Sequence, residues 1–121
     1  MTLAAPTFAP TPNGVVVLTA SETLTDVVDA GVNTTILDAR GLSGLTFHLF
    51  NGGNQTTVFQ LKQSSSSAFT TDQNVGESIS LAATTGEEVA VLTDPAMYLR
   101  WNVNPSGAST GDITIEVTGR K

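Results

Sequence analysis

Apolar and polar residues alternate along much of this chain, and the clearest alternation lies near its C-terminal end. There the apolar positions are Met97, Leu99, Trp101 and Val103 in one run, and Ile113, Ile115 and Val117 in a second. A period of two is typical of a strand with one buried face. The turn-forming residues 104–111 between the runs predict a C-terminal hairpin. Because its apolar face holds the only tryptophan of the chain, we expect Trp101 to be buried against other strands.

The same pattern recurs upstream in short segments separated by turn signals, and no segment shows the spacing of an amphipathic helix. The sequence Asn51-Gly52-Gly53-Asn54 predicts a tight hairpin turn, because Gly and Asn accept positive φ at low cost. About eight strands at this spacing predict an all-β fold, an antiparallel β-sandwich of jelly-roll or immunoglobulin-like topology. The upstream strands are expected at residues 15–20 and 23–30, as two strands or one bent strand, and at 34–39, 45–50, 56–63, 78–82 and 87–93.

The domain organisation follows from the distribution of prolines. Residues 14–121 are expected to form a single β-sandwich domain. Residues 1–13 contain three prolines, which favour extended backbone, and therefore predict an N-terminal arm. Its apolar residues Leu3 and Phe8 suit an arm that docks on another surface, although a frayed terminus is equally compatible with the sequence.

One long irregular stretch interrupts the strand pattern at residues 64–76. It is rich in serine and has a single apolar anchor, Phe69, so it predicts a surface loop, and loops of this length are often functional. Asp72 to Glu77 begins with the spacing of a calcium loop but lacks the remaining ligands. We therefore expect no metal site there.

Composition excludes several partners. The chain has 5 Lys and Arg against 11 Asp and Glu, a formal charge of -6, and such a chain repels phosphate backbones unless its cations cluster. Arg40, Lys62 and Arg100 are far apart in the sequence, so we expect no cluster and no nucleic-acid partner. The chain has no cysteine, which excludes disulfides and thiolate metal sites. It has neither a continuous run of about 18 apolar residues nor the pattern of a secretory signal, so we expect no membrane partner and synthesis in a reducing cytoplasm.

No motif indicates a catalytic chemistry. His48 is the only histidine and alternates with core residues, which places it on the outer face of a strand. Nucleophile-elbow and phosphate-loop motifs are absent from the sequence. Asp26, Asp29 and Asp38 are not forced together by any pattern. We expect no catalytic, cofactor-binding or metal-binding residues, no cofactor and no enzyme activity, and instead a binding or structural module.

The apolar residues that alternate outward are candidates for an interface. A sandwich that exposes them has surface available for self-association, and closed symmetry is the usual outcome. We therefore expect a homo-oligomer. The candidate interface residues are Leu3, Phe8, Phe50, Val58 and Tyr98.

Four segments resemble small β-sandwich proteins of tailed bacteriophages. These proteins combine a D-x-R/S-G turn with a G-x-x-x-F strand, and later a Y-x-R-x-x-V strand with a G-x-I-T-I-x-V terminal strand. The matching segments here are Leu37 to Gly41, Gly44 to Leu49, Tyr98 to Val103 and Gly111 to Val117.

The resemblance implies a virion accessory protein, most directly a capsid decoration or cement protein on the outer surface of the head. Its partners would be the major capsid protein and further copies of itself, with a trimer favoured, and the Pro-rich arm would contact the shell or a neighbour. The alternatives are a head-fibre or tail-associated structural protein, or, from another class, a carbohydrate-binding module.

Overall fold

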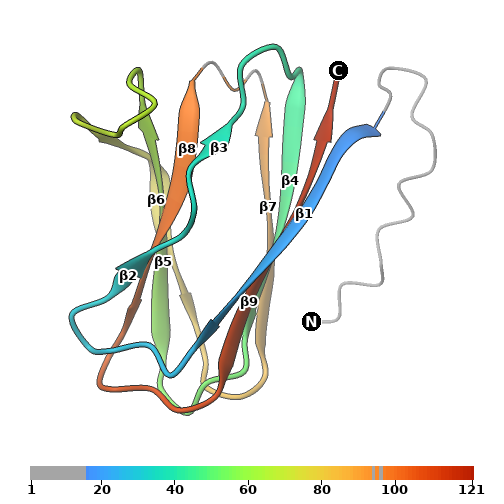
Figure 1. Ribbon diagram of the computed structural model, residues 1–121. Helices are drawn as coiled ribbons and strands as arrows, with labels where there is room; N and C mark the ends of the chain where they lie inside the picture. The colour runs from blue at the N-terminus through green and yellow to red at the C-terminus, as the bar shows by residue number, and fades with distance from the viewer. Residues whose placement is uncertain (1–15, 94, 96) are drawn as a thin grey trace.

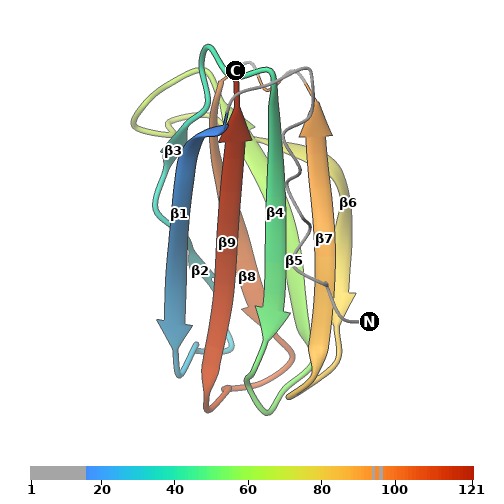
Figure 2. The same ribbon diagram turned by 90° about the vertical axis from the view of Figure 1, so that its right-hand side faces the viewer.

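The computed structural model describes residues 16–93, 95 and 97–121, and these form nine strands in two facing sheets (Figures 1 and 2). All pairings are antiparallel, in the orders β1-β9-β4-β7 and β2-β8-β5-β6, with β3 also paired to β8. The described part contains no helix that is long and apolar enough to cross a membrane. The all-β sandwich prediction is confirmed. The strands are β1 (Val16–Thr25), β2 (Val32–Asn33), β3 (Leu37–Asp38), β4 (Gly44–Asn51), β5 (Thr57–Ser64), β6 (Gln73–Leu81), β7 (Gly86–Thr93), β8 (Tyr98–Pro105) and β9 (Asp112–Arg120).

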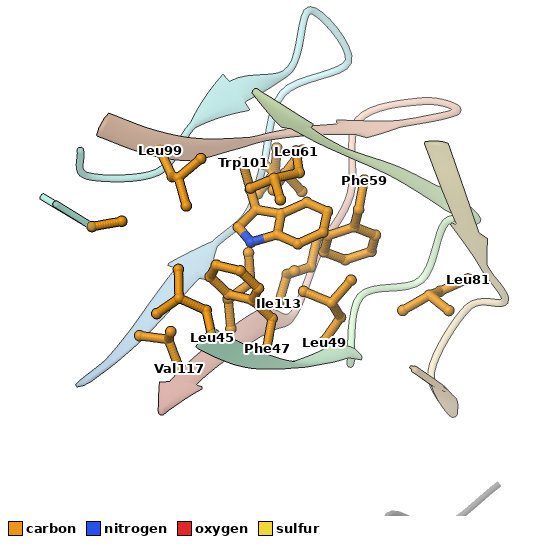
Figure 3. Packing of buried hydrophobic residues seen from close by; sticks show 14 residues of the cluster. Leu45, Phe47, Leu49, Phe59, Leu61, Leu81, Leu99, Trp101, Ile113 and Val117 are labelled. Atoms are coloured by element: carbon orange, nitrogen blue, oxygen red, sulfur yellow. The ribbon is translucent and has the colours of Figure 1, made fainter. Parts of the chain in front are cut away.

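The core lies between the two sheets and is built from the inward positions of the long strands (Figure 3). Trp101 is only 3 % exposed, as the alternation predicts. Its ring makes edge-to-face contacts with Phe47 of the facing sheet at 5.2 Å and with Phe59 of the neighbouring strand at 6.5 Å, an arrangement that aromatic pairs favour. The indole therefore joins the two sheets at the centre of the sandwich.

The predicted C-terminal hairpin is wrong. β8 and β9 lie in different sheets, so residues 106–111 arch from one sheet to the other instead of joining paired strands. The same holds for β4 and β5. Among the described strands, only β5 and β6 are both consecutive and paired. Alternation identifies a strand with one buried face but not the sheet to which it belongs, since both sheets bury the same kind of face.

The Gly52-Gly53 pair has a different role from the one predicted. Neither residue has positive φ. Instead, a Cβ at Gly52 would lie 2.5 Å from the carbonyl oxygen of Asp112, and one at Gly53 would overlap the hydroxyl of Ser109. The two glycines therefore allow the β4–β5 arch to pack against the β8–β9 arch, where no side chain would fit.

One open alternative is resolved, and two predicted elements differ from the structure. β1 is one continuous strand, which was one of the two alternatives. Residues 34–39 pair with β8 only briefly, through β3, so this predicted strand is largely irregular. β6 begins at Gln73, five residues before its predicted start, which shortens the loop to residues 65–72 and places most of the calcium-like segment in a strand. Leu3, Phe8 and the arm of residues 1–13 lie outside the described residues.

Candidate functional site

The candidate interface residues that the structure describes do not form one patch. Phe50 lies half-buried on the outer face of the β1-β9-β4-β7 sheet, across from Glu87. Val58 and Tyr98 lie on the outer face of the other sheet, but at opposite ends of it, since Val58 pairs with Asn104 and Tyr98 with Ser64. Six residues of β8 separate these two positions, about 20 Å along a strand. Their role as an interface stays a prediction.

Three cations converge on the outer face of the second sheet, although the sequence separates them. Lys62 of β5 and Arg100 of β8 are directly paired across the strands. The guanidinium carbon of Arg40 lies 4.8 Å from the centre of the Tyr98 ring, two residues from Arg100 along β8. The expectation that these cations would not cluster is therefore wrong. We call Arg40, Lys62, Phe69, Tyr98 and Arg100 the basic–aromatic cluster.

The loop of residues 65–72 contributes Phe69 to this cluster. Phe69 is buried, as predicted for the loop anchor, and the guanidinium carbon of Arg100 lies 4.3 Å from its ring centre. Its backbone has φ of +53°, a conformation that non-glycine residues rarely adopt. The packing against Arg100 and the hydrogen bond that the Phe69 N–H donates to the Ser66 carbonyl at 3.0 Å hold the loop in this geometry.

Two of the three cations have carboxylate partners. Arg40 donates from Nε and from a terminal nitrogen to the two carboxylate oxygens of Asp38, each at 2.9 Å. These hydrogen bonds lower the pKa of the Asp38 carboxyl below its usual value and raise the pKa of Arg40. Lys62 Nζ lies 3.8 Å from Asp72. The first pair is exposed, so it orders the surface more than it stabilises the fold.

Arg100 differs from its neighbours because the described part of the chain offers it no carboxylate. Its Nε is buried and has no hydrogen-bond acceptor there. The residue directly across the sheet, Lys62, has the same charge, an arrangement that is unfavourable in isolation. A planar guanidinium presents its terminal nitrogens as a fork, and this fork matches a carboxylate. The cluster can therefore bind an acidic group from outside the chain.

The candidate catalytic residues do not assemble in the described chain. His48 lies on the outer face of β4, with Nε2 at 3.5 Å from a carboxylate oxygen of Glu87. Asp26 directly follows β1, and its carboxylate accepts the N–H of Gly111, whereas Asp38 lies in β3 beside Arg40. Among residues 16–93, 95 and 97–121, no three His, Asp or Glu side chains are close enough together to hold a metal ion. The absence of enzyme activity stays a prediction.

Comparisons with known proteins place the chain by its fold. No protein-family model and no curated protein matches its sequence. The PBSX exported protein XepA superposes with a TM-score of 0.66 at 7 % identity, over 84 % of this chain and 36 % of XepA. The SPBc2 prophage-derived protein YomS superposes with a TM-score of 0.51 at 9 % identity, over 88 % of this chain and 98 % of YomS. PirA superposes with a TM-score of 0.52 at 17 % identity, over 84 % of this chain and 92 % of PirA.

What they share is the sandwich fold. Two of the three neighbours are phage-derived, in agreement with the resemblance to phage β-sandwich proteins. The chain spans about a third of the length of XepA, so it corresponds to one part of that protein. At identities this low the likeness shows the fold and not a shared activity.

Sequence reasoning missed the basic–aromatic cluster for a specific reason. The outward positions of Tyr98 and Arg100 follow from the alternation of β8. The pairing of Lys62 with Arg100 depends on which strands are neighbours, and the return of Arg40 onto Tyr98 depends on the path of the chain after β3. Neither is encoded in local spacing.

Proposed function

We propose that this protein is a structural accessory protein of a tailed-phage virion that binds the outer surface of the capsid as a decoration or cement protein. The observation that carries the proposal is the fold shared with XepA and YomS, two proteins described as products of PBSX and of the SPBc2 prophage. The match to YomS covers nearly all of both chains, so a sandwich of this size occurs as a phage-derived protein by itself.

The surface supports binding to a protein partner. In a chain with a formal charge of -6, three of the five Lys and Arg residues meet in the basic–aromatic cluster. Arginine and aromatic residues are enriched in protein interfaces, where a buried ring and a bidentate ion pair contribute most of the binding energy. We propose that the cluster contacts acidic side chains of the major capsid protein.

Self-assembly is part of the proposal. Among the described strands, β1 and β7 form the edges of the four-stranded sheet, and both expose valines. Val17 of β1 is 50 % exposed and Val91 of β7 is 66 % exposed. Apolar side chains on unpaired edges favour association with further copies. We propose a closed homo-oligomer, with a trimer suggested by the resemblance to phage decoration proteins.

The proposal predicts that recombinant protein binds to heads of the phage that encodes it. In a sedimentation assay with heads from a phage lacking this gene, Arg100→Gln should weaken binding by about tenfold, which corresponds to ~1.4 kcal/mol. Arg100→Lys should be intermediate, because it keeps the charge but loses the fork. Raising the salt concentration should reduce the differences in head-binding affinity between these variants and the unaltered protein, because salt screens the charge on Arg100.

Lys121→Gln is the matched control, since it removes one positive charge from an exposed residue outside the basic–aromatic cluster. It should change head binding by less than about threefold. Failure of the unaltered protein to bind either intact or emptied heads would refute the capsid proposal. Binding to a glycan array instead would favour a carbohydrate-binding module.

The N-terminal arm provides an independent prediction. Deleting residues 2–12 should leave the circular dichroism of the sandwich unchanged, because the described strands begin at Val16. Head binding, or the oligomer measured by sedimentation equilibrium at micromolar concentration, should fall by about tenfold or more, since the prolines reduce the entropy lost when the arm docks. A truncated protein identical to the full chain in both assays would show that the terminus is passive. Failure to fold would show that the arm belongs to the domain.

A second candidate is a phage-encoded protein that is exported from the host and is not built into the virion. XepA is described as an exported protein, which favours this alternative. Mass spectrometry of purified virions and of the cleared lysate separates the two. The decoration proposal predicts many copies per virion, whereas the export proposal predicts the protein only in the soluble fraction.

A further inference from the structure

A cavity of about 420 Å³ opens at one edge of the sandwich, between residues 20–22 of β1 and residues 34–37, the segment that connects β2 to β3. Because β2 and β3 have two residues each, they leave this edge incompletely closed. The inner walls are apolar and come from both sheets, through Phe47, Leu61, Leu99, Ile115 and Val117. Cavities of this size hold small organic molecules, and apolar walls favour a hydrocarbon body.

A carboxylate stands among apolar neighbours at the mouth of this cavity. Glu22 occupies an inward position of β1, since it pairs directly with the core residue Ile115 and alternates with Leu24, which packs on the core. It is half-buried, and its Oε1 accepts the N–H of Thr35 at 2.9 Å across the opening. A charged side chain at a position that alternation assigns to the core breaks the pattern of the strand, and such breaks are expected at functional sites.

The Glu22 carboxylate has no cationic partner within the described ranges, where the ion pairs involve other carboxylates. Of the described residues that line the cavity, it is the only acidic one and Arg100 is the only basic one. Arg100 points to the outer face of β8, where its guanidinium carbon lies 4.3 Å from the ring centre of Phe69. The mouth therefore keeps a negative charge beside an apolar interior, in a chain whose formal charge of -6 also favours cations.

We propose that this cavity binds a small organic cation, a primary ammonium group on a cyclic or branched hydrocarbon body. The hydrocarbon fills the apolar interior, and the ammonium stays at the mouth, where it donates hydrogen bonds to the carboxylate of Glu22. This carboxylate repels an anion, whereas a neutral molecule gains the apolar contacts without the ion pair. The proposal does not depend on the capsid-binding function.

The position of the charge also selects a free amine over a lysine of a partner protein. A free amine enters with its hydrocarbon first and leaves its ammonium beside Glu22. A lysine side chain carries its ammonium at the tip, so it would place the charge in the apolar interior, which is unfavourable.

Three compounds that share one ring test the preference for charge at neutral pH: cyclohexylammonium, cyclohexanol and cyclohexanecarboxylate. Each is titrated into the full-length protein, and binding is followed by the backbone amide resonances of residues 20–22 and 34–37, which flank the mouth. We expect cyclohexylammonium to shift these resonances saturably, with a Kd of about 1 mM or below, and to bind at least about tenfold more tightly than the other two. Nα-acetyl-lysine amide, which attaches the lysine side chain to a peptide unit, should not bind.

Two variants and a control assign the two parts of the site. Glu22→Gln removes the charge but keeps an acceptor for the Thr35 N–H, so cyclohexylammonium should bind no more tightly than cyclohexanol. Glu116→Gln is the matched control, because it removes the same charge from the exposed outer face of the same sheet, and it should leave all three affinities unchanged. Ala20→Leu should obstruct the mouth and weaken cyclohexylammonium binding about tenfold, and Ala20→Val serves if the leucine variant does not fold.

No saturable shift, equal affinities for the three ring compounds, tightest binding of the alcohol or the carboxylate, or shifts confined to other parts of the chain would overturn the proposal. So would an Ala20 variant that binds as the unaltered protein does. If Glu22→Gln keeps the preference for the ammonium, the carboxylate only protects the edge strand β1 from pairing, and the proposal is wrong. Saturable binding of Nα-acetyl-lysine amide at the mouth would refute the free amine and indicate a lysine of a partner protein.

Discussion

Replacing Trp101 with alanine should destabilise the fold by about 3 to 5 kcal/mol, the usual cost of removing a large buried aromatic side chain. Trp101 is 3 % exposed and contacts aromatic rings in both sheets, Phe47 at 5.2 Å and Phe59 at 6.5 Å. The truncated side chain would leave a void between the two sheets, and the sheets would lose their central contact. For a domain whose total stability is about 5 to 15 kcal/mol, this is a large fraction.

Urea unfolding followed by far-ultraviolet circular dichroism measures this effect, because the variant lacks the only tryptophan and cannot be followed by its fluorescence. Tyr98→Ala is the matched control on the same strand. Tyr98 points outward beneath Arg40, so its removal should cost less than about 1.5 kcal/mol. Equal unfolding midpoints for the unaltered protein and Trp101→Ala would show that the indole does not join the sheets.

The burial of Trp101 could be predicted because alternation is a local property. A period of two fixes which side chains share a face, and it correctly places Trp101 inward and Arg100 outward. The same reasoning correctly places Phe59 and Leu61 in the core and Val58 on the surface. Each of these predictions depends only on neighbours within a few residues.

Strand pairing could not be predicted in the same way. A loop rich in Gly and Asn is compatible with a hairpin and with an arch between sheets, since both need a compact reversal. The deciding feature is long-range: the β4–β5 and β8–β9 arches pack on each other through Gly52, Gly53 and Ser109. The basic–aromatic cluster also depends on long-range pairing, because it requires β5 beside β8.

Asn51, a polar residue of the predicted turn, holds several backbone segments together through its side chain. Its side chain is fully buried at the end of β4. The two hydrogens of Nδ2 are shared among the carbonyls of Gln55 at 2.8 Å and of Leu81 and Ala82 at 3.1 Å each, and Oδ1 accepts the N–H of Gly53 at 3.1 Å. One amide thus satisfies backbone groups from the β4–β5 arch and from the end of β6.

Asn51→Ala should therefore destabilise the protein by about 3 kcal/mol, since each buried backbone group left without a partner costs about 1 to 3 kcal/mol and water can reach some of them. Asn51→Asp is the more informative variant. It keeps the acceptor for Gly53 but places a second oxygen against three carbonyl oxygens, so it should be at least as damaging at neutral pH and should partly recover in acid, where the protonated carboxyl can donate one hydrogen bond.

Asn33→Ala is the control for both variants, because Asn33 is exposed and accepts a single side-chain hydrogen bond from Asn102. Its unfolding midpoint should stay close to that of the unaltered protein. If Asn51→Ala behaves like Asn33→Ala, the arch is held by its glycines and backbone contacts alone. If Asn51→Asp is destabilised equally at neutral and acid pH, the loss comes from the shape of the site and not from the donor that the asparagine provides, because protonation restores a donor without changing the size of the side chain.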